Sequence, residues 1–187
     1  MTRLLEILIC LCLLVVAVPI CAVTYFIVIA TLGRPVVFRQ SRAGTGGAPF
    51  DVIKFRTLTD DRDEHGVWLP DEVRLLPAGK FLRRPRFDEL PQLFNVFKGE
   101  MSFIGPRPER PEFVEKLVRE VPYYNQRHNV KPGLAGWAQL NYPYGASVED
   151  SMEKLKFDLY YVKHQSLLLD ILILIRTVEI VLFGKGR

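Results

Sequence analysis

Two adjacent carboxylates, Asp88 and Glu89, follow directly behind a cluster of arginines in the middle of the chain. The arginines are Arg83, Arg84 and Arg86. We expect Asp88 to be the N-cap of a helix whose first turn contains Glu89. Pro91 is tolerated in that turn because the first N–H groups of a helix have no partner within it. The helix N-terminus and the guanidinium groups both favour the ionised carboxylate.

The same local field attracts phosphate. An ionised carboxylate beside a phosphate-binding site has what a nucleophile needs in covalent phosphoryl transfer. The other interpretation of the pair is a helix cap that carries surface salt bridges. Taken alone, the motif favours the cap.

The composition indicates a protein that works at a membrane. The 187 residues suffice for one domain with a core, or for a small domain with membrane elements. The hydrophobic content is 49% and is concentrated at the two ends of the chain. The net charge of +4 suits anionic partners such as lipid headgroups or nucleotides. We predict no nucleic-acid partner, because the basic residues are mixed with 21 acidic ones and no recognition motif is present.

The N-terminal hydrophobic segment carries no charged residue from Ile7 to Leu32. As one helix it would be roughly 39 Å long, more than the hydrocarbon core of about 30 Å. Pro19 lies near its centre and predicts a break or kink near Val18. The three cysteines of the chain, all in this segment, are expected to pack as small apolar residues.

Two arrangements of this segment remain open. A kinked helix could cross the bilayer once, or the chain could turn at Pro19 and return to the same face. Positive charge does not separate them, because Arg3 flanks one end and Arg34 the other. The arms of 12 and 13 residues on either side of Pro19 are short for a full span and suit a re-entrant hairpin.

The remaining pattern predicts an α/β unit over residues 34–165. Residues 35–40 and 50–56 are expected to form two strands joined by a glycine-rich turn at 41–47. Residues 111–127 predict an amphipathic helix that Pro122 ends or kinks. Residues 166–183 form a second apolar helix, interrupted by Asp170, which either lies in the membrane interface or packs in the core.

Arg107 stands between Pro106 and Pro108, which restrict the backbone on both sides of one guanidinium. Rigid presentation lowers the entropy lost when an arginine binds a phosphate or a carboxylate. The segment is either a structural turn or an anion clamp. Residues 128–139 follow as a loop rich in glycine and proline, and Trp137 in that loop suits either a ligand contact or the membrane interface.

Taken together, these segments resemble the bacterial sugar transferase family, the monotopic phosphoglycosyl transferases that start glycan assembly on polyprenol phosphate. The resemblance covers nearly the whole chain, and its motifs occur in the family's order. Besides the segment centred on Pro19, the matching residues are 37–40, 54–57, 88–96, 101–108, 131–133, 136–139 and 158–161.

The resemblance implies a reaction and roles for residues. A UDP-sugar would donate its sugar-1-phosphate to polyprenol (undecaprenyl) phosphate and release UMP, the first membrane step of glycan or exopolysaccharide assembly. Asp88 would be the nucleophile that forms a covalent phosphosugar-enzyme. Glu89 would assist it, and the two carboxylates would hold Mg²⁺. The resemblance further implies phosphate-binding and active-site residues. They are Arg107, Lys54 and Arg84 for substrate phosphate, and Asp158 as a further active-site residue.

The resemblance also implies a fold and a location. We expect a small membrane-associated α/β domain with a re-entrant helix over residues 1–33, broken at Pro19. Residues 34–187 would form the catalytic domain on the cytoplasmic face of the bacterial inner membrane, with interfacial helices and a small β element. The partners would be the UDP-sugar, polyprenol phosphate and membrane lipid, and the resemblance leaves room for a homodimer. One departure is Val18 before Pro19, where a serine is common in the family.

Overall fold

The structure is a computed structural model that describes residues 2–143, 145 and 147–183. It confirms the mixed α/β class and the N-terminal apolar helix. Its residues group into two compact units. The first contains residues 1–10, 41–52 and 95–187, and the second contains residues 11–40 and 53–94. The expected domain boundary at residues 33 and 34 concerns the membrane, and it stays a prediction.

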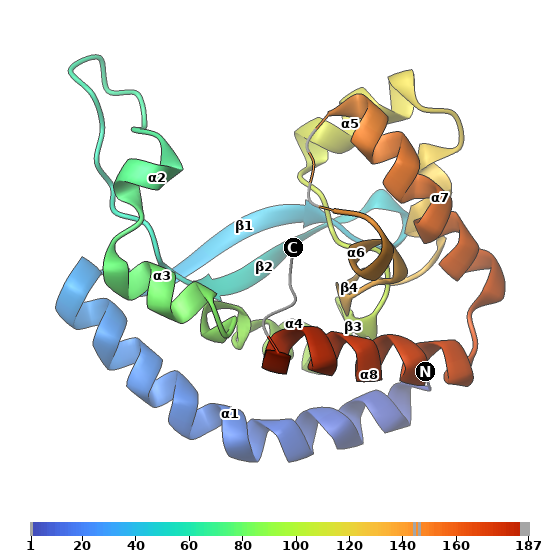
Figure 1. The fold of residues 1–187 in the computed structure, drawn as a ribbon, viewed down its shortest axis with the longest axis horizontal. Helices are drawn as coiled ribbons and strands as arrows, with labels where there is room; N and C mark the ends of the chain where they lie inside the picture. The colour runs from blue at the N-terminus through green and yellow to red at the C-terminus, as the bar shows by residue number, and fades with distance from the viewer. Residues whose placement is uncertain (1, 144, 146, 184–187) are drawn as a thin grey trace. The chain divides into compact units, whose positions relative to one another are not determined.

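Helices outnumber strands along the chain (Figure 1). The helices are α1 (Arg3–Leu32), α2 (Asp71–Arg74), α3 (Pro77–Arg83), α4 (Gln92–Lys98), α5 (Pro111–Glu120), α6 (Trp137–Asn141), α7 (Val148–His164) and α8 (Leu167–Phe183). The strands are β1 (Val37–Ala43), β2 (Pro49–Phe55), β3 (Ser102–Ile104) and β4 (Gly133–Ala135). Short 3-10 helices occupy Thr45–Gly47, Phe87–Glu89 and Tyr124–Asn129.

Helix α1 continues through Pro19 over its 30 residues. Of the two outcomes predicted near Val18, a break or a kink, the break is therefore wrong. Figure 1 shows the helix bent along its length. A proline removes one backbone hydrogen bond and bends a helix, and the bonds on either side keep the turns together. By length and composition, α1 is apolar enough to cross a membrane.

The core of the second unit is built on the C-terminal half of α1. Val28 of α1 packs with Phe55 of β2 and Leu82 of α3. Leu32 and Phe87 are partly buried against the same cluster. Helix α3 lies close to the chain that follows β2, because a Cβ added at Gly79 would stand 2.3 Å from the carbonyl oxygen of Thr57. The turn that contains Phe87 is therefore fixed by apolar packing.

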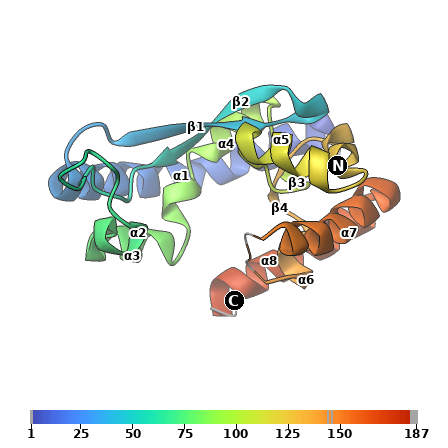
Figure 2. The ribbon, with the colours of Figure 1, turned by 90° about the horizontal axis from the view of Figure 1, so that it is seen from above.

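Strands β1 and β2 form the predicted hairpin, and the two arrows run in opposite directions in Figures 1 and 2. The first strand reaches Ala43, three residues beyond the prediction, and the connection is correspondingly tighter. Gly46 and Gly47 adopt φ values of 65° and 80°, a region that glycine enters without a steric penalty.

Strands β3 and β4 pair in parallel, with Ser102 opposite Gly133 and Ile104 opposite Ala135. The sequence did not predict this pair, because strands of three residues carry no readable alternation. Glycine is needed here for close approach: a Cβ added at Gly133 would stand 2.1 Å from the backbone nitrogen of Gly105. The segment predicted as a loop over residues 128–139 therefore contains a strand, β4.

Helix α5 confirms the amphipathic helix predicted from Pro111, and it ends at Glu120, before Pro122. Its apolar side contributes Leu117 to a core cluster of the first unit. The other buried members of that cluster are Val121, Tyr124 and Leu155. Helix α7, which supplies Leu155, begins with a capping box between Ser147 and Asp150.

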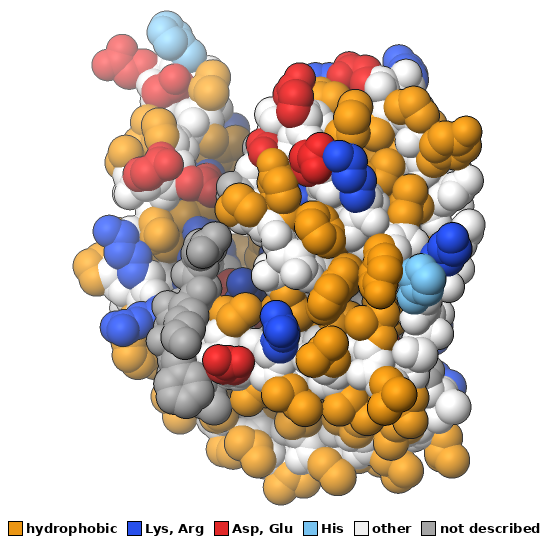
Figure 3. Space-filling model, turned by 45° about the vertical axis from the view of Figure 1, so that its right-hand side comes forward, with side chains coloured by type: hydrophobic (Ala, Val, Ile, Leu, Met, Phe, Trp, Pro, Cys, Tyr) orange, Lys and Arg blue, Asp and Glu red, His pale blue; other side chains and the backbone are white. Residues whose placement is uncertain are grey.

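Helix α8 matches the apolar helix predicted over 166–183. Asp170 and Ile173 are fully buried, whereas Leu168 and Ile175 are 80% and 62% exposed. The exposed residues exclude a helix that is buried on all sides. Exposed apolar side chains of this kind are prominent on the face drawn in Figure 3. The interfacial placement of α8 stays a prediction.

Candidate active site

Asp88 lies inside a 3-10 turn, Phe87–Glu89, and the α-helix begins only at Gln92. The expectation that Asp88 is the N-cap is therefore wrong. The residue before the turn is Arg86, which has a φ of 59°. A left-handed conformation is uncommon for a residue with a side chain, and it starts the turn earlier than the sequence suggests. Strain of this kind is typical of functional sites.

The carboxyl of Asp88 is buried, with 8% of the residue exposed. Burial raises its pKa above the usual value, and the charge of Glu89 raises it further. The positive charges of Lys54 and Arg83 act in the opposite direction. The arginines were expected to favour the ionised form; burial and the charge of Glu89 shift the pKa in the other direction.

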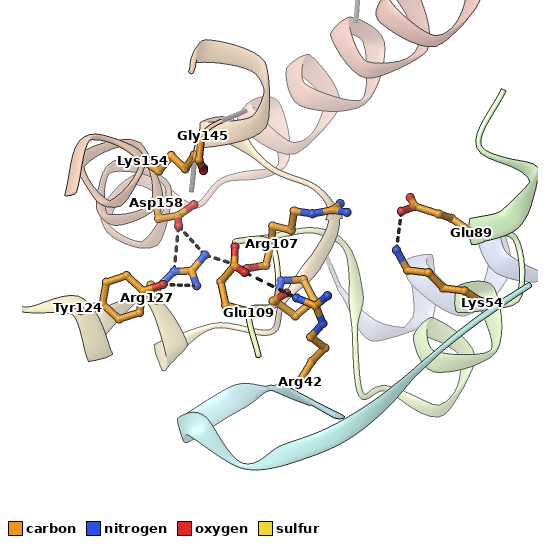
Figure 4. Close-up of polar contacts among 11 residues, drawn as sticks. Arg42, Lys54, Glu89, Arg107, Glu109, Tyr124, Arg127, Gly145, Lys154 and Asp158 are labelled. Carbon is orange, nitrogen blue, oxygen red and sulfur yellow. Dashed lines mark hydrogen bonds and ion pairs between the residues drawn. The ribbon is translucent and has the colours of Figure 1, made fainter. Parts of the chain in front are cut away.

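Glu89 is held by two cations. The ammonium of Lys54, on β2, lies 2.8 Å from its Oε1 (Figure 4). Nη1 of Arg86 lies 3.3 Å from its Oε2. The Glu89 side chain is 16% exposed and that of Lys54 is 23% exposed, so this ion pair is only partly screened by water. The hairpin thus brings Lys54 beside Glu89, although the two residues are 35 positions apart in the sequence.

The arginine whose charge lowers the pKa of Asp88 is Arg83, a member of the predicted arginine cluster that was not assigned to substrate phosphate. Arg84 ends helix α3 and is exposed. Its role in substrate binding stays a prediction.

In the first unit, the segment around Arg107 is fixed through four consecutive backbone carbonyls. The carbonyl of Pro106 accepts from the backbone N–H of Gly133 at 3.0 Å, and that of Glu109 accepts from Ala43 at 2.9 Å. The carbonyl of Arg107 accepts from Arg127 at 2.8 Å. The carbonyl of Pro108 accepts from Arg42 at 3.1 Å. These hydrogen bonds hold the backbone on both sides of Arg107. The role of its side chain as an anion clamp stays a prediction.

Asp158 lies on α7 and forms a buried ion pair with Arg127 (Figure 4). Two guanidinium nitrogens reach its Oδ2, Nε at 2.9 Å and Nη2 at 2.8 Å, and the two side chains are 4% and 5% exposed. Burial raises the pKa of the Asp158 carboxyl, and the facing guanidinium opposes that shift. Because Arg127 also donates to Arg107, Asp158 supports the Arg107 segment indirectly. Sequence reasoning missed Arg127, since nothing in its neighbourhood marks it as the partner of Asp158.

The carboxylate pair offers hard oxygen donors of the kind that Mg²⁺ prefers. Among the residues that the structure describes, no group of three or more His, Cys, Asp or Glu side chains could hold a metal ion. Mg²⁺ in phosphoryl-transfer sites is commonly bound by one or two carboxylates together with substrate phosphates. Asp88 and Glu89 fit that mode and not a site made of protein ligands alone.

Comparison with known proteins connects these features to a family. The profile of the bacterial sugar transferase family matches residues 1–184. The chain belongs to this family. One relative is the UDP-N-acetylgalactosamine-undecaprenyl-phosphate N-acetylgalactosaminephosphotransferase of Aeromonas hydrophila. The two proteins are 45% identical over 154 residues, and this alignment covers 81% of this chain and 36% of that protein.

Two further relatives differ in length. The uncharacterized sugar transferase EpsL of Bacillus subtilis is 45% identical over 167 residues, covering 87% of this chain and 78% of that protein. The UDP-glucose:undecaprenyl-phosphate glucose-1-phosphate transferase of Xanthomonas campestris is 41% identical over 157 residues, covering 81% of this chain and 32% of that protein. The matched region is therefore 36% and 32% of the Aeromonas and Xanthomonas relatives.

The buried ion pair of this sugar transferase generates a stability prediction. Replacing Asp158→Asn leaves the Arg127 charge buried without its counter-charge, and such a loss costs about 3–5 kcal/mol of unfolding free energy. Thermal unfolding in detergent measures it. Lys156→Ala, on the same helix, breaks the exposed pair with Glu153 and should change stability by about 0.5 kcal/mol or less. Equal shifts for the two variants would contradict the structural role of Asp158.

Burial of Asp88 generates a pH-dependent prediction. Because the folded-state pKa is raised, ionising Asp88 costs stability at neutral pH, and this cost disappears as the pH falls through the folded-state value. Asp88→Asn should therefore unfold at a higher temperature than the wild type at pH 7, with the gap closing toward pH 4. Asp71→Asn, at a side chain that is 65% exposed, provides the control. A destabilised Asp88→Asn at pH 7 would contradict the raised pKa.

Proposed function

We propose that this chain transfers sugar-1-phosphate from a UDP-sugar to polyprenol (undecaprenyl) phosphate, giving a polyprenol-diphosphate sugar and UMP. The observation that carries the proposal is the carboxylate pair, with a buried Asp88 under the influence of Lys54 and Arg83. Membership of the bacterial sugar transferase family supports it, as do relatives named as undecaprenyl-phosphate sugar-phosphate transferases. This reaction would be the first membrane step in assembling a glycan such as an exopolysaccharide.

The proposed chemistry has two displacements at one phosphorus. A carboxylate oxygen of Asp88 attacks the phosphorus nearest the sugar, the bond to the distal phosphate breaks, and UMP leaves with the bonding electrons. An oxygen of polyprenol phosphate then attacks the same phosphorus. The acyl-phosphate bond breaks, which releases the product and restores the Asp88 carboxylate.

Burial gives Asp88 a property that this chemistry uses. A carboxylate whose pKa is raised is a stronger base, and therefore a better nucleophile, once it is ionised. Lys54 and Arg83 favour the ionised form and thus limit that rise. The same two cations are positioned to attract the diphosphate. Glu89, held between Lys54 and Arg86, keeps Lys54 in place.

The phosphate-binding roles of Arg107 and Arg84 belong to the same proposal. The carbonyl contacts around Arg107 support a clamp, since little backbone order remains to be lost on binding. For Asp158 we propose a positioning role: it holds Arg127, and Arg127 holds the Arg107 backbone. Asp88 and Glu89 would bind Mg²⁺ together with substrate oxygens, and the ion would neutralise charge on the diphosphate.

We further propose that α1 is re-entrant and that residues 34–187 lie on the cytoplasmic face of the inner membrane. The contacts at the start of α1 support this arrangement. Arg3 donates to the carbonyls of Val96, at 2.7 Å, and Phe97, and Ser102 donates to Glu6. A helix that crossed the bilayer once would carry Arg3 and Glu6 to the opposite side from those partners. The exposed apolar side chains of α8 suit an interfacial position on the same face.

A covalent intermediate separates this mechanism from direct attack of polyprenol phosphate on the UDP-sugar. We expect the wild type to release UMP in a burst when it is given Mg²⁺ and the UDP-sugar that it accepts from a panel, without polyprenol phosphate. The protein should then gain the mass of the sugar phosphate. Asp88→Asn should lose the burst and turnover by at least about 10³-fold, because an amide cannot form the intermediate. Asp71→Asn is the matched control and should keep both.

Three experimental outcomes would each contradict a different part of the proposal. Turnover without any adduct on the protein would leave Asp88 as a metal ligand only. Activity retained by Asp88→Asn would make the residue a structural part of the turn. No UMP release from any member of a panel of UDP-sugars would remove the transferase assignment itself.

The topology has its own test in membrane vesicles. In a variant whose native cysteines are replaced by alanine, single reporters are introduced as Thr2→Cys and Ser41→Cys. A membrane-impermeant maleimide should label both reporters in inside-out vesicles and neither in right-side-out vesicles. Labelling of the two reporters in vesicles of opposite orientation would establish a single crossing instead.

A further inference from the structure

Gln92 is a buried amide whose donor has no partner. The residue is 5% exposed, and its Nε2 makes no hydrogen bond within the part of the chain that the structure describes. Leaving such a donor buried and unsatisfied is destabilising, and native structures contain few of them. An explanation is therefore needed for why glutamine stands here.

Gln92 lies one turn after Asp88 in the same run of chain. Backbone bonds link the 3-10 turn to α4 without a gap: the N–H of Leu90 donates to Phe87 at 3.3 Å, and the N–H of Leu93 donates to Leu90 at 3.0 Å. Both bonds join residues three apart, as in a 3-10 helix, so Gln92 follows Asp88 by little more than one turn of the chain. Both side chains are buried, and both belong to the second unit.

The next amide of the helix shows what a structural role looks like. Asn95 is fully buried, and its Nδ2 donates to the carbonyl of Asp51 and to Glu100, both at 2.7 Å. Its hydrogen-bonding capacity is used by the protein. Gln92 is nearly as buried, and its Nε2 has no such partner among the residues that the structure describes.

We propose that Gln92 binds the phosphoryl group that Asp88 receives. Its Nε2–H donates to a non-bridging oxygen of the phosphate during attack and in the phosphosugar-enzyme. The inference rests on the proposed function and adds a residue to that site. A neutral donor suits the position, because a cation there would pair with the Asp88 carboxylate and lower its pKa before substrate arrives. An amide stabilises charge that develops on the phosphoryl oxygens without neutralising the nucleophile.

The test is Gln92→Met, which keeps the length of the side chain and removes the unsatisfied donor. Thermal unfolding should show a melting temperature equal to or above that of the wild type. The burst of UMP without acceptor should slow by about 10²-fold, the order found when one donor to a developing oxyanion is removed. The loss should fall on kcat rather than on KM for the UDP-sugar, since the bond strengthens as charge develops.

Asn95→Leu serves as the comparison, because it should lower the melting temperature instead. Two results would overturn the inference for Gln92. An unchanged burst in Gln92→Met would make the residue a packing residue only. A lower melting temperature would show that the amide serves the fold. A wild type that releases no UMP would fail at the level of the proposed function and take this role of Gln92 with it.

Discussion

The packing of Phe87 against the apolar helix α1 determines the chemistry of its neighbour. Phe87 lies partly buried against the cluster formed by Val28, Phe55 and Leu82. Complete burial of a side chain of this size stabilises a fold by about 1.5–3 kcal/mol, and Phe87 gains part of that. Because Asp88 follows in the same tight turn, it is drawn into a poorly solvated position. Its pKa rises as a result, and the favourable packing of one residue offsets the unfavourable burial of the next.

The two polar clusters solve the problem of buried charge differently. Arg127 and Asp158 neutralise each other in a buried ion pair, and the paired Arg127 holds the backbone carbonyl of Arg107. The charges around Asp88 are arranged differently. Glu89 forms the ion pairs with Lys54 and Arg86, and the charges of Lys54 and Arg83 act on Asp88 electrostatically. The nucleophile proposed here is thus the carboxylate whose cations are shared with a neighbour, and the acid with a positioning role proposed for it is the one with a full ion pair.

Much of this could be predicted from sequence where a local rule applied. The apolar run of α1, the hairpin of β1 and β2, and the end of α5 before Pro122 all follow from periodicity and proline. The adjacent carboxylates were visible as a pair. The left-handed Arg86, which moves Asp88 off the helix cap, follows no local rule. Neither does the pairing of Arg127 with Asp158 or the parallel contact of β3 with β4, since each depends on segments that meet only in the folded chain.

Arg3 has a consequence for the order in which the chain matures. The last carbonyls of α4 at Val96 and Phe97 receive their hydrogen bonds from Arg3, more than ninety residues earlier in the chain. Arg3 therefore leaves the ribosome long before the two carbonyls that it contacts have been made. The last turn of α4 gains these two hydrogen bonds only when it reaches the start of α1. The beginning of the apolar helix thus has a polar role of its own, because it completes the end of a helix made much later.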